Sequence, residues 1–309
     1  MTTFRGNILV IRGGAIGDFV LTLPAIAALR QQFPQARLEV LGYPHIVQLA
    51  VAGGLVDRAR AIDARPLAGF FARNGELAEE LRDYFSEFDL IVSYLYDPDQ
   101  IFRTNVGRCS PAQFIAGPHR PDESANVPAA KVYLHPLERL AIFEADPVPR
   151  LVLKGLDSPA PTLDQLVLHP GSGSEHKNWS ELRWVDLLQQ LLDGTEFNLL
   201  LVGGEAEGER LQRLAGPLPP SRIRVAQNLP LVELAAVLAR SRYFIGHDSG
   251  ISHLAAAVGL PGLVLWGDTS EAIWRPPSEK FVVLKHRSGL ARLAVTDVLT
   301  QVQAACSAV

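Results

Sequence analysis

The sequence predicts an α/β protein built from two doubly wound parallel sheets. Apolar runs of strand length alternate with segments of helical spacing, and this alternation occurs twice, before residue 118 and after residue 163. The chain has 309 residues, which is longer than one hydrophobic core usually grows. We therefore expect two Rossmann-like domains, over residues 1–150 with a linker and over residues 151–309, facing a central cleft.

The first half begins with a short apolar run over residues 7–12 that ends in glycines, which is typical of a strand buried on both faces. A helix is expected over residues 18–33, starting late or bending because Pro24 lies inside it. Residues 118–163 are rich in proline and bracket one amphipathic segment, so we expect them to connect the domains. The other elements expected in this half are strands at 36–42, 89–94 and 112–117 and a helix at 78–88.

The alternation of predicted strands and helices begins again in the second half. The last helix could pack on its own domain or back on the N-terminal one. The expected strands are 165–171, 197–204, 223–226, 242–247 and 263–267, and the expected helices are 181–192, 205–216, 231–241, 249–259 and 295–306.

The composition is that of an ordinary globular enzyme. With 48% hydrophobic residues and a net charge of −4, the chain is neither disordered nor a basic nucleic-acid binder. Its two cysteines, Cys109 and Cys306, are far apart and form no metal spacing. No apolar run is long enough to span a membrane, so we expect a cytoplasmic protein. A peripheral contact with the inner face of the cytoplasmic membrane stays open.

The segment IRGGAIGDF, Ile11 to Phe19, carries a strand into glycines and then into a helix, a geometry that presents backbone N–H groups to an anion. A dinucleotide fingerprint would need glycine at position 12, where this chain has Arg12, which argues against a nicotinamide or flavin site. Asp18 has two interpretations: a carboxylate that caps the helix, or a general base facing the cleft. The spacing leaves both open.

The segment HPGSGSEHKNWS follows a predicted buried strand. Its small residues Gly171, Ser172, Gly173 and Ser174 allow close backbone approach and supply donors, and Lys177 supplies a compact positive charge. This combination predicts a diphosphate-binding loop. The alternative is a surface turn with a solvated lysine.

Glu205 follows two glycines at the end of another predicted strand, where its carboxylate could accept hydrogen bonds from ribose hydroxyls. The alternative is an acidic residue that the first turn of a helix favours in any case.

A third loop, after the predicted strand 242–247, places Asp248, Ser249 and Gly250 where a strand turns into a helix. We count His253, on that helix, among the residues near the donor. A metal site formed by His253 and His247 lacks a third ligand, so a structural histidine is favoured. Three such loops at strand ends in one domain predict a nucleotide site that needs no metal cage.

Several motifs together resemble glycosyltransferase family 9, the ADP-heptose:lipopolysaccharide heptosyltransferases and their relatives. The similarity runs from about residue 6 to 280, and YLHPLERL also resembles the interdomain region of the family. The motifs are GGAIGDFVLTLPAIAAL, HPGSGSEHKNWS, VGGEAEGE and GHDSGISHLAAAVGLPGLVLWGDT.

The resemblance implies a GT-B fold and inverting, metal-independent transfer of a heptose from an ADP-sugar donor to a saccharide acceptor, free or lipid-linked, such as the lipopolysaccharide inner core. It makes Asp18 the base and assigns Lys177 to the diphosphate and Glu205 to the ribose. It assigns Asp248 and Ser249 to the donor sugar and phosphate. Lys177 and the nearby amides would stabilise the charge on the leaving ADP.

The chain departs from the family just before Asp18, where Arg12, Gly13 and Gly14 replace a lysine and small hydroxyl residues. This puts the substrate in doubt, and we expect Gly14 and Arg65 on the acceptor side. One alternative is a transferase of the same fold with another nucleotide sugar or acceptor. Another is a binding protein without catalysis, against which the presence of Asp18 and Lys177 together argues.

Overall fold

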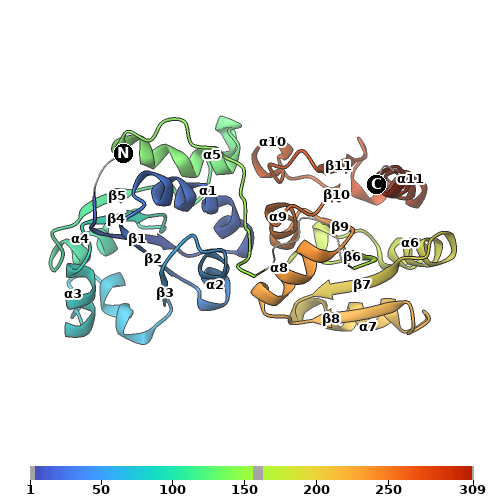
Figure 1. Ribbon diagram of the computed structural model, residues 1–309, viewed down its shortest axis with the longest axis horizontal. Coiled ribbons are helices and arrows are strands. Elements are labelled where there is room, and N and C mark those ends of the chain that lie inside the picture. Colours follow the sequence, from blue (N-terminus) through green and yellow to red (C-terminus); the bar gives the residue numbers. More distant parts are fainter. Residues whose placement is uncertain (1–3, 156–162, 308–309) are drawn as a thin grey trace. The chain divides into compact units, whose positions relative to one another are not determined.

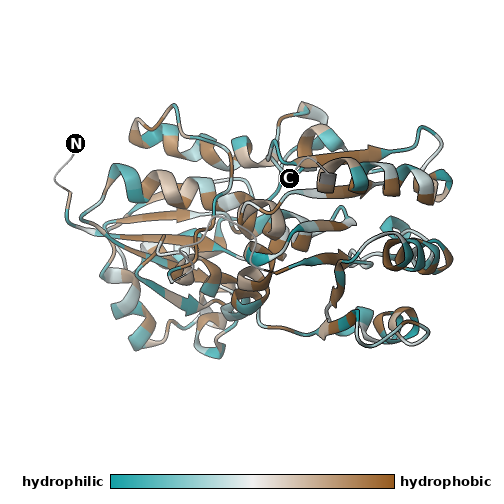
Figure 2. Ribbon diagram, turned by 45° about the vertical axis from the view of Figure 1, so that its right-hand side comes forward, coloured by the Kyte–Doolittle hydropathy of each residue, from teal (hydrophilic) through white to brown (hydrophobic). Residues whose placement is uncertain are grey.

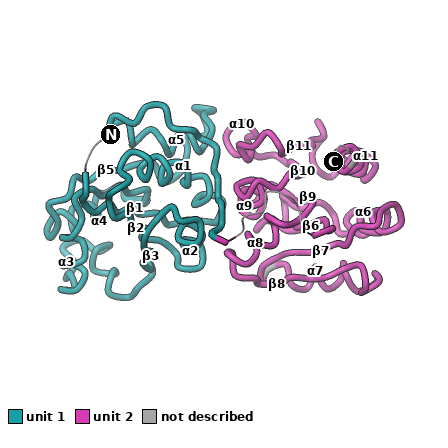
Figure 3. The backbone as a smooth tube through the Cα atoms, in the orientation of Figure 1, with its two compact units in different colours: residues 1–154 teal, residues 155–309 magenta. Residues whose placement is uncertain are grey.

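The computed structural model of the protein describes residues 4–155 and 163–307. The chain divides into two compact units, residues 1–154 and residues 155–309 (Figure 3). The division lies at 154/155, where the sequence suggested 150/151. No helix within the described residues is both long and apolar enough to cross a membrane.

The N-terminal unit holds five parallel strands in the order β3-β2-β1-β4-β5 (Figure 1). Its most central strand is wholly apolar between Ile8 and Ile11, and these residues are at most 1% exposed. The strands are β1 (Asn7–Arg12), β2 (Arg37–Gly42), β3 (Arg58–Ala61), β4 (Leu90–Ser93) and β5 (Gln113–Ala116).

The first helix differs from the sequence expectation, because α1 begins at Ile16 and runs unbroken through Pro24 to Gln32. The buried face of α1 extends on both sides of the proline, so its packing offsets the backbone hydrogen bond that Pro24 cannot donate. The other helices are α2 (Pro44–Ala52), α3 (Glu79–Ser86), α4 (Ile101–Gly107) and α5 (Ala129–Leu134), with 3-10 turns η1 (Arg65–Phe71), η2 (Glu123–Ala125) and η3 (His135–Leu140).

Much of the expected linker is in fact part of the N-terminal unit. Helix α5 packs against α1, and Tyr133 and Leu137 are fully buried. The amphipathic segment therefore completes this domain rather than joining two of them. Residues 156–162, which also belong to the expected linker, lie outside the described residues.

The C-terminal unit holds six parallel strands in the order β11-β10-β9-β6-β7-β8. Strand β11, at one edge, was not expected from the sequence. The strands are β6 (Gln165–His169), β7 (Asn198–Gly203), β8 (Ile223–Gln227), β9 (Tyr243–His247), β10 (Gly262–Trp266) and β11 (Phe281–Lys285).

The final helix contributes to the core of its own unit. Val298 and Val302 of this helix share a buried core with Leu187 and Leu188. The helices of the unit are α6 (Glu181–Gly194), α7 (Gly208–Ala215), α8 (Leu231–Arg240), α9 (Gly250–Ala257), α10 (Glu271–Trp274) and α11 (Val295–Ser307), with 3-10 turns η4 (Glu175–Lys177), η5 (Glu205–Glu207) and η6 (Leu290–Arg292).

The interior strands of both sheets are predominantly hydrophobic (Figure 2). Because all strands in each sheet are parallel, their carboxyl ends lie at one edge of the sheet. In each sheet, successive strands are added first on one side of the first strand and then on the other. This reversal lies between β1 and β4 in the N-terminal sheet and between β6 and β9 in the C-terminal sheet. Ligand sites of doubly wound sheets form outside the carboxyl ends of the strands at such switch points.

Candidate active site

Asp18 lies at the switch point of the N-terminal sheet, in the first turn of α1 directly after β1. Its Oδ2 atom accepts a hydrogen bond from the backbone N–H of Ala15 at 3.2 Å, so the carboxylate does cap the helix. Its Oδ1 atom lies 3.4 Å from Nη2 of Arg12 and 3.4 Å from the hydroxyl of Tyr133. The side chain is still 28% exposed, so a substrate hydroxyl can reach it.

Arg12 is a buried cation at the end of β1. Its Nη1 atom donates to the backbone oxygens of His119 at 2.8 Å and Tyr94 at 3.3 Å. Its guanidinium carbon lies 4.5 Å from the centre of the Tyr133 ring, an electrostatically favourable position for a cation. Arg12 therefore joins the loops after β4 and β5 to the carboxylate of Asp18.

Tyr133 comes from α5 and was missed by the sequence reasoning. Burial raises the pKa of Tyr133 to about 12, so its hydroxyl stays protonated and donates to Asp18. The tyrosine lies 115 positions away from the aspartate in the chain, so the sequence around Asp18 gave no sign of it, and the segment YLHPLERL that contains it was quoted only as an interdomain region.

The two residues expected on the acceptor side differ in their relation to Asp18. Gly14 has φ of +95°, and a Cβ atom there would lie 3.1 Å from Asp18 Oδ2, so a side chain would be strained and would crowd the carboxylate. Arg65 is exposed in the first turn of η1, beyond the end of β3 and two strands away from β1. Within residues 4–155 the structure shows no bond between Arg65 and Asp18.

At the switch point of the C-terminal sheet, three loops meet at Asp248. Nζ of Lys177 lies 2.8 Å from Oδ2 of Asp248, and the Thr269 hydroxyl donates to the same oxygen at 2.7 Å. The three residues come from the loops after β6, β9 and β10. Asp248 is buried, whereas Lys177 is 36% exposed. The lysine is thus fixed by a charged partner and still has donors available on its open side.

The small residues of the loop after β6 are needed for its shape. A Cβ atom on Gly171 would lie 2.3 Å from Cγ of Glu207, and Gly173 has φ of +73°. The Ser172 hydroxyl lies 2.8 Å from the backbone oxygen of Ser174 and 2.7 Å from Oδ1 of Asn178. Ser172 is therefore engaged within the loop itself.

Among the acidic residues that follow β7, Glu205 and Glu207 have different surroundings. Glu205 is exposed at the start of η5. Glu207 is buried, accepts a hydrogen bond from the Gly204 N–H at 2.9 Å and packs against Gly171. The sequence reasoning passed over Glu207, although an acid three residues after Gly204 fits a capping box.

Ser249 and Gly250 begin α9. The Ser249 hydroxyl accepts a hydrogen bond from the Ser252 N–H at 3.4 Å and lies 3.3 Å from Nδ1 of His169. His253 is buried on the same helix. No group of three metal-binding side chains is found in residues 4–155 and 163–307.

His247 is structural. Its Nε2 atom accepts the Trp179 N–H at 2.9 Å, and its Nδ1 atom lies 3.3 Å from the backbone oxygen of Gly171, to which it donates. Burial lowers the pKa of His247 to about 3, so the ring is neutral and can play both roles. The histidine ties the loop after β6 to β9.

Comparison with known proteins bears on this site. Residues 155–302 match the sequence model of glycosyltransferase family 9 (heptosyltransferase). Lipopolysaccharide heptosyltransferase 1 of Pseudomonas aeruginosa is 26% identical over 290 residues, which cover 85% of this chain and 79% of that protein. The family match spans nearly the whole unit that contains Lys177 and Asp248, and the relative extends the likeness into the unit that contains Asp18. The chain is a glycosyltransferase, and its C-terminal unit is similar to family 9.

Solved structures agree on the fold of this glycosyltransferase. ADP-heptose lipopolysaccharide heptosyltransferase II of Escherichia coli has a TM-score of 0.78 and 19% identity, covering 97% of this chain and 98% of that one. An E. coli heptosyltransferase solved with ADP has a TM-score of 0.75 and 18% identity, covering 97% and 99%. The expected α/β class with two parallel Rossmann-like sheets, as in the GT-B fold, is confirmed.

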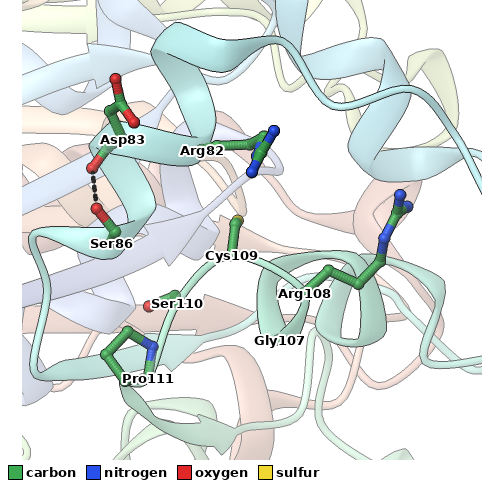
Figure 4. A pocket seen from close by; sticks show the side chains of 8 residues that line it. All are labelled: Arg82, Asp83, Ser86, Gly107, Arg108, Cys109, Ser110 and Pro111. Carbon is green, nitrogen blue, oxygen red and sulfur yellow. Dashed lines mark hydrogen bonds between the residues drawn. The ribbon is translucent and has the colours of Figure 1, made fainter.

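The glycosyltransferase also has a polar pocket of about 450 Å³ that lies away from these residues (Figure 4). It is formed at the end of α3 and in the turn from α4 into β5, hence at the amino edge of the N-terminal sheet. Asp18 lies at the opposite, carboxyl edge. The residues lining it are Arg82, Asp83, Ser86, Gly107, Arg108, Cys109, Ser110 and Pro111.

Proposed function

We propose that this glycosyltransferase moves a heptose from ADP-heptose to a saccharide acceptor such as the lipopolysaccharide inner core, with inversion and without a metal ion. The observation that carries the proposal is the Lys177–Asp248–Thr269 cluster at the switch point of the C-terminal sheet. The names of the relatives support it, since they include lipopolysaccharide heptosyltransferases and one enzyme solved with ADP.

In this proposal the C-terminal unit binds the donor. Lys177 keeps one hydrogen bond to Asp248 and turns its remaining donors to the diphosphate, whose charge grows as ADP leaves. The close backbone approach at Gly171 and Gly173, the hydroxyl of Ser174 and the N–H groups at Ser249 and Gly250 would supply further donors.

One acid after β7 binds the ribose. Glu205, as predicted from the sequence, is exposed, whereas Glu207 is buried and holds the loop. His253, which is buried on α9, belongs to the same donor-binding side.

The N-terminal unit binds the acceptor. Asp18 takes the proton from an acceptor hydroxyl, and that oxygen forms a bond to the anomeric carbon while the bond to the diphosphate breaks. The electron pair leaves with ADP, and attack from the opposite face inverts the anomeric centre. Arg12 and Tyr133 hold the carboxylate in place, while Gly14 and Arg65 lie on the acceptor side. A lipid-linked acceptor would bring the enzyme to the cytoplasmic face of the membrane by peripheral contact.

The experiment is a thermal-shift titration with ADP, UDP and GDP, each with and without Mg²⁺, followed by a transfer assay with ADP-heptose and deacylated inner-core oligosaccharide. A ligand at 100 times its Kd should stabilise the protein by about 2.7 kcal/mol. We expect ADP, but not UDP or GDP, to stabilise the protein, and to do so equally with and without Mg²⁺. The Lys177→Met variant should lose this stabilisation by ADP. Equal stabilisation by UDP or GDP, or a strict need for Mg²⁺, would contradict the proposal.

A further inference from the structure

An exposed tyrosine paired with a histidine lies on each side of the loop that carries Asp18. The rings of Tyr96 and His119 have centroids 4.6 Å apart, and Tyr96 is 70% exposed. The rings of Tyr43 and His45 have centroids 6.1 Å apart, and Tyr43 is 38% exposed. Tyr43, Tyr96 and His119 belong to loops at the carboxyl edge of the N-terminal sheet, and His45 lies in the first turn of α2, which begins at that edge.

The strand register fixes these pairs relative to the Asp18 loop. Gly42, the last residue of β2, is paired with Arg12, the last residue of β1. Tyr43 therefore leaves the sheet at the level of Gly13. On the other side, the Tyr94 N–H donates to the Ile11 oxygen at 2.9 Å, which brings the start of the β4 loop beside the end of β1.

Arg12 connects one of the pairs to the carboxylate directly. The guanidinium that lies 3.4 Å from Asp18 also holds the backbone oxygens of Tyr94 and His119. It thereby anchors both loops that carry the Tyr96–His119 pair. On the β2 side, a Cβ atom on Gly42 would lie 2.5 Å from the Arg12 oxygen, so the chain before Tyr43 runs close against the end of β1.

Because Tyr96 is 70% exposed, the face of its ring is open to a ligand, and an aromatic ring offers a large apolar contact area. An aromatic ring has a negative face, and the apolar face of a sugar ring presents C–H bonds of slight positive charge to it. The tyrosine hydroxyl and the histidine nitrogens add hydrogen-bonding groups suited to sugar hydroxyls. A pair of this kind matches a saccharide better than it matches a phosphate.

We propose that the Tyr43–His45 and Tyr96–His119 pairs bind sugar rings of the acceptor on either side of Asp18. Since β2 and β4 are separated by two strand spacings, about 10 Å, the pairs are too far apart to serve one ring. The acceptor is then at least a disaccharide. This inference rests on the proposed function, in which an acceptor saccharide reacts at Asp18.

The test uses the full chain and four variants: Tyr43→Ala, Tyr96→Ala and their ring-retaining counterparts Tyr43→Phe and Tyr96→Phe. Leu182→Ala, which removes an exposed apolar side chain from the C-terminal unit, serves as the surface control. We measure the KM for deacylated inner-core oligosaccharide, the KM for ADP-heptose, and the thermal shift with ADP. Saturation-transfer NMR with the same oligosaccharide measures binding without turnover.

We expect each alanine variant to raise the acceptor KM about fivefold to tenfold and to weaken the NMR signal, whereas the donor KM and the ADP shift stay unchanged. The phenylalanine variants and Leu182→Ala should stay within about twofold of wild type, because the stacking face is kept. Unchanged acceptor KM in either alanine variant, or an equal loss in the phenylalanine variants, overturns the inference. If the wild type transfers no heptose, the proposed function fails, and the NMR arm alone then decides whether the pairs bind the oligosaccharide.

Discussion

At the scale of single residues, Asp18 shows that a structural and a chemical interpretation of one side chain can both apply. One carboxylate oxygen caps α1 through the Ala15 N–H, and the other faces Arg12 and Tyr133. The cap fixes the carboxylate at the helix start. A fixed and partly exposed carboxylate is what a general base requires.

We expect Asp18→Asn to lower kcat by about 10²–10⁴, the usual contribution of a general base, and to leave ADP binding unchanged. The asparagine amide oxygen can still accept the Ala15 N–H, so the fold should be retained. The measurement is single-turnover transfer together with the ADP thermal shift.

The matched control is Asp297→Asn. Asp297 occupies the same third position of α11 and accepts the N–H of Ala294 at 3.3 Å, as Asp18 does for Ala15. We expect it to retain transfer activity. A similar loss in both variants would mean that Asp18 acts only as a cap.

Sequence reasoning found those site residues that lie in the loop or first helical turn after a strand, because a strand that ends in glycines or small residues is visible in the chain. Asp18, Lys177 and Asp248 were named in this way, and the structure brings the last two into contact. Tyr133 begins the segment YLHPLERL, which was quoted only for its resemblance to an interdomain region, and tertiary packing alone brings it to Asp18. The part that each of these residues takes in catalysis stays a prediction.

At the scale of elements, the loop after β6 is held from two neighbouring strands. His247, at the end of β9, bonds both the start and the end of the loop, through Gly171 and Trp179. Glu207, after β7, packs against Gly171 from the other side. The loop is thus shaped before any ligand arrives, which reduces the entropy cost of binding.

Gly171→Ala should disturb this arrangement, because its Cβ would lie 2.3 Å from Cγ of Glu207. We expect a loss of about 1–3 kcal/mol in the free energy of unfolding, typical of overpacking, and a weaker ADP thermal shift. Urea denaturation measures the first quantity. The double variant with Glu207→Ala removes the clash and should lose less than the sum of the two single changes. Strict additivity would show that the two residues do not interact.

The stability of the C-terminal unit should also depend on pH through its buried histidines. Burial lowers the pKa of His247 from 6.5 to about 3 and that of His169 from 6.5 to about 4. Between these values and 6.5 the unfolded chain binds protons that the folded one does not. The free energy of unfolding is therefore highest above pH 6.5 and decreases as the pH falls toward 4.

Urea midpoints at pH 7, 6, 5 and 4 check this expectation. His247→Gln should flatten the profile, although it lowers stability at pH 7 by removing the bonds to Gly171 and Trp179. An unchanged slope in the variant would show that His247 does not carry the effect.

At the scale of the whole molecule, the sequence predicted two parallel α/β units because the interior strands are continuous apolar runs. The strands that escaped prediction, β3 and β11, lie at the edges of their sheets. The sequence of β3, RARA, is half charged and only partly buried, so it lacks the apolar run on which the prediction depends. The amphipathic segment around Tyr133 was predicted to be part of the linker because the residues on both sides of it are rich in proline.

We expect ADP to slow amide hydrogen exchange in the loops after β6, β9 and β10 of the full-length protein. These loops meet at Asp248, which accepts from Lys177 and Thr269, and ligand binding there suppresses local opening. Exchange measured by mass spectrometry with and without ADP tests this. The Lys177→Met variant should lose the protection, and protection that persists in that variant would place the nucleotide elsewhere.

The strand orders of the two sheets have a consequence for biosynthesis. In each unit the strand translated first, β1 or β6, becomes an interior strand, and later strands join it first on one side and then on the other. A nascent chain can therefore extend each sheet outward from an interior strand, and no existing strand pair has to separate to admit a strand that is translated later. The N-terminal unit, including Arg12 and the α5 that carries Tyr133, is translated in full before β6. On the ribosome, Asp18 can acquire its partners before the residues proposed to bind the nucleotide have been made.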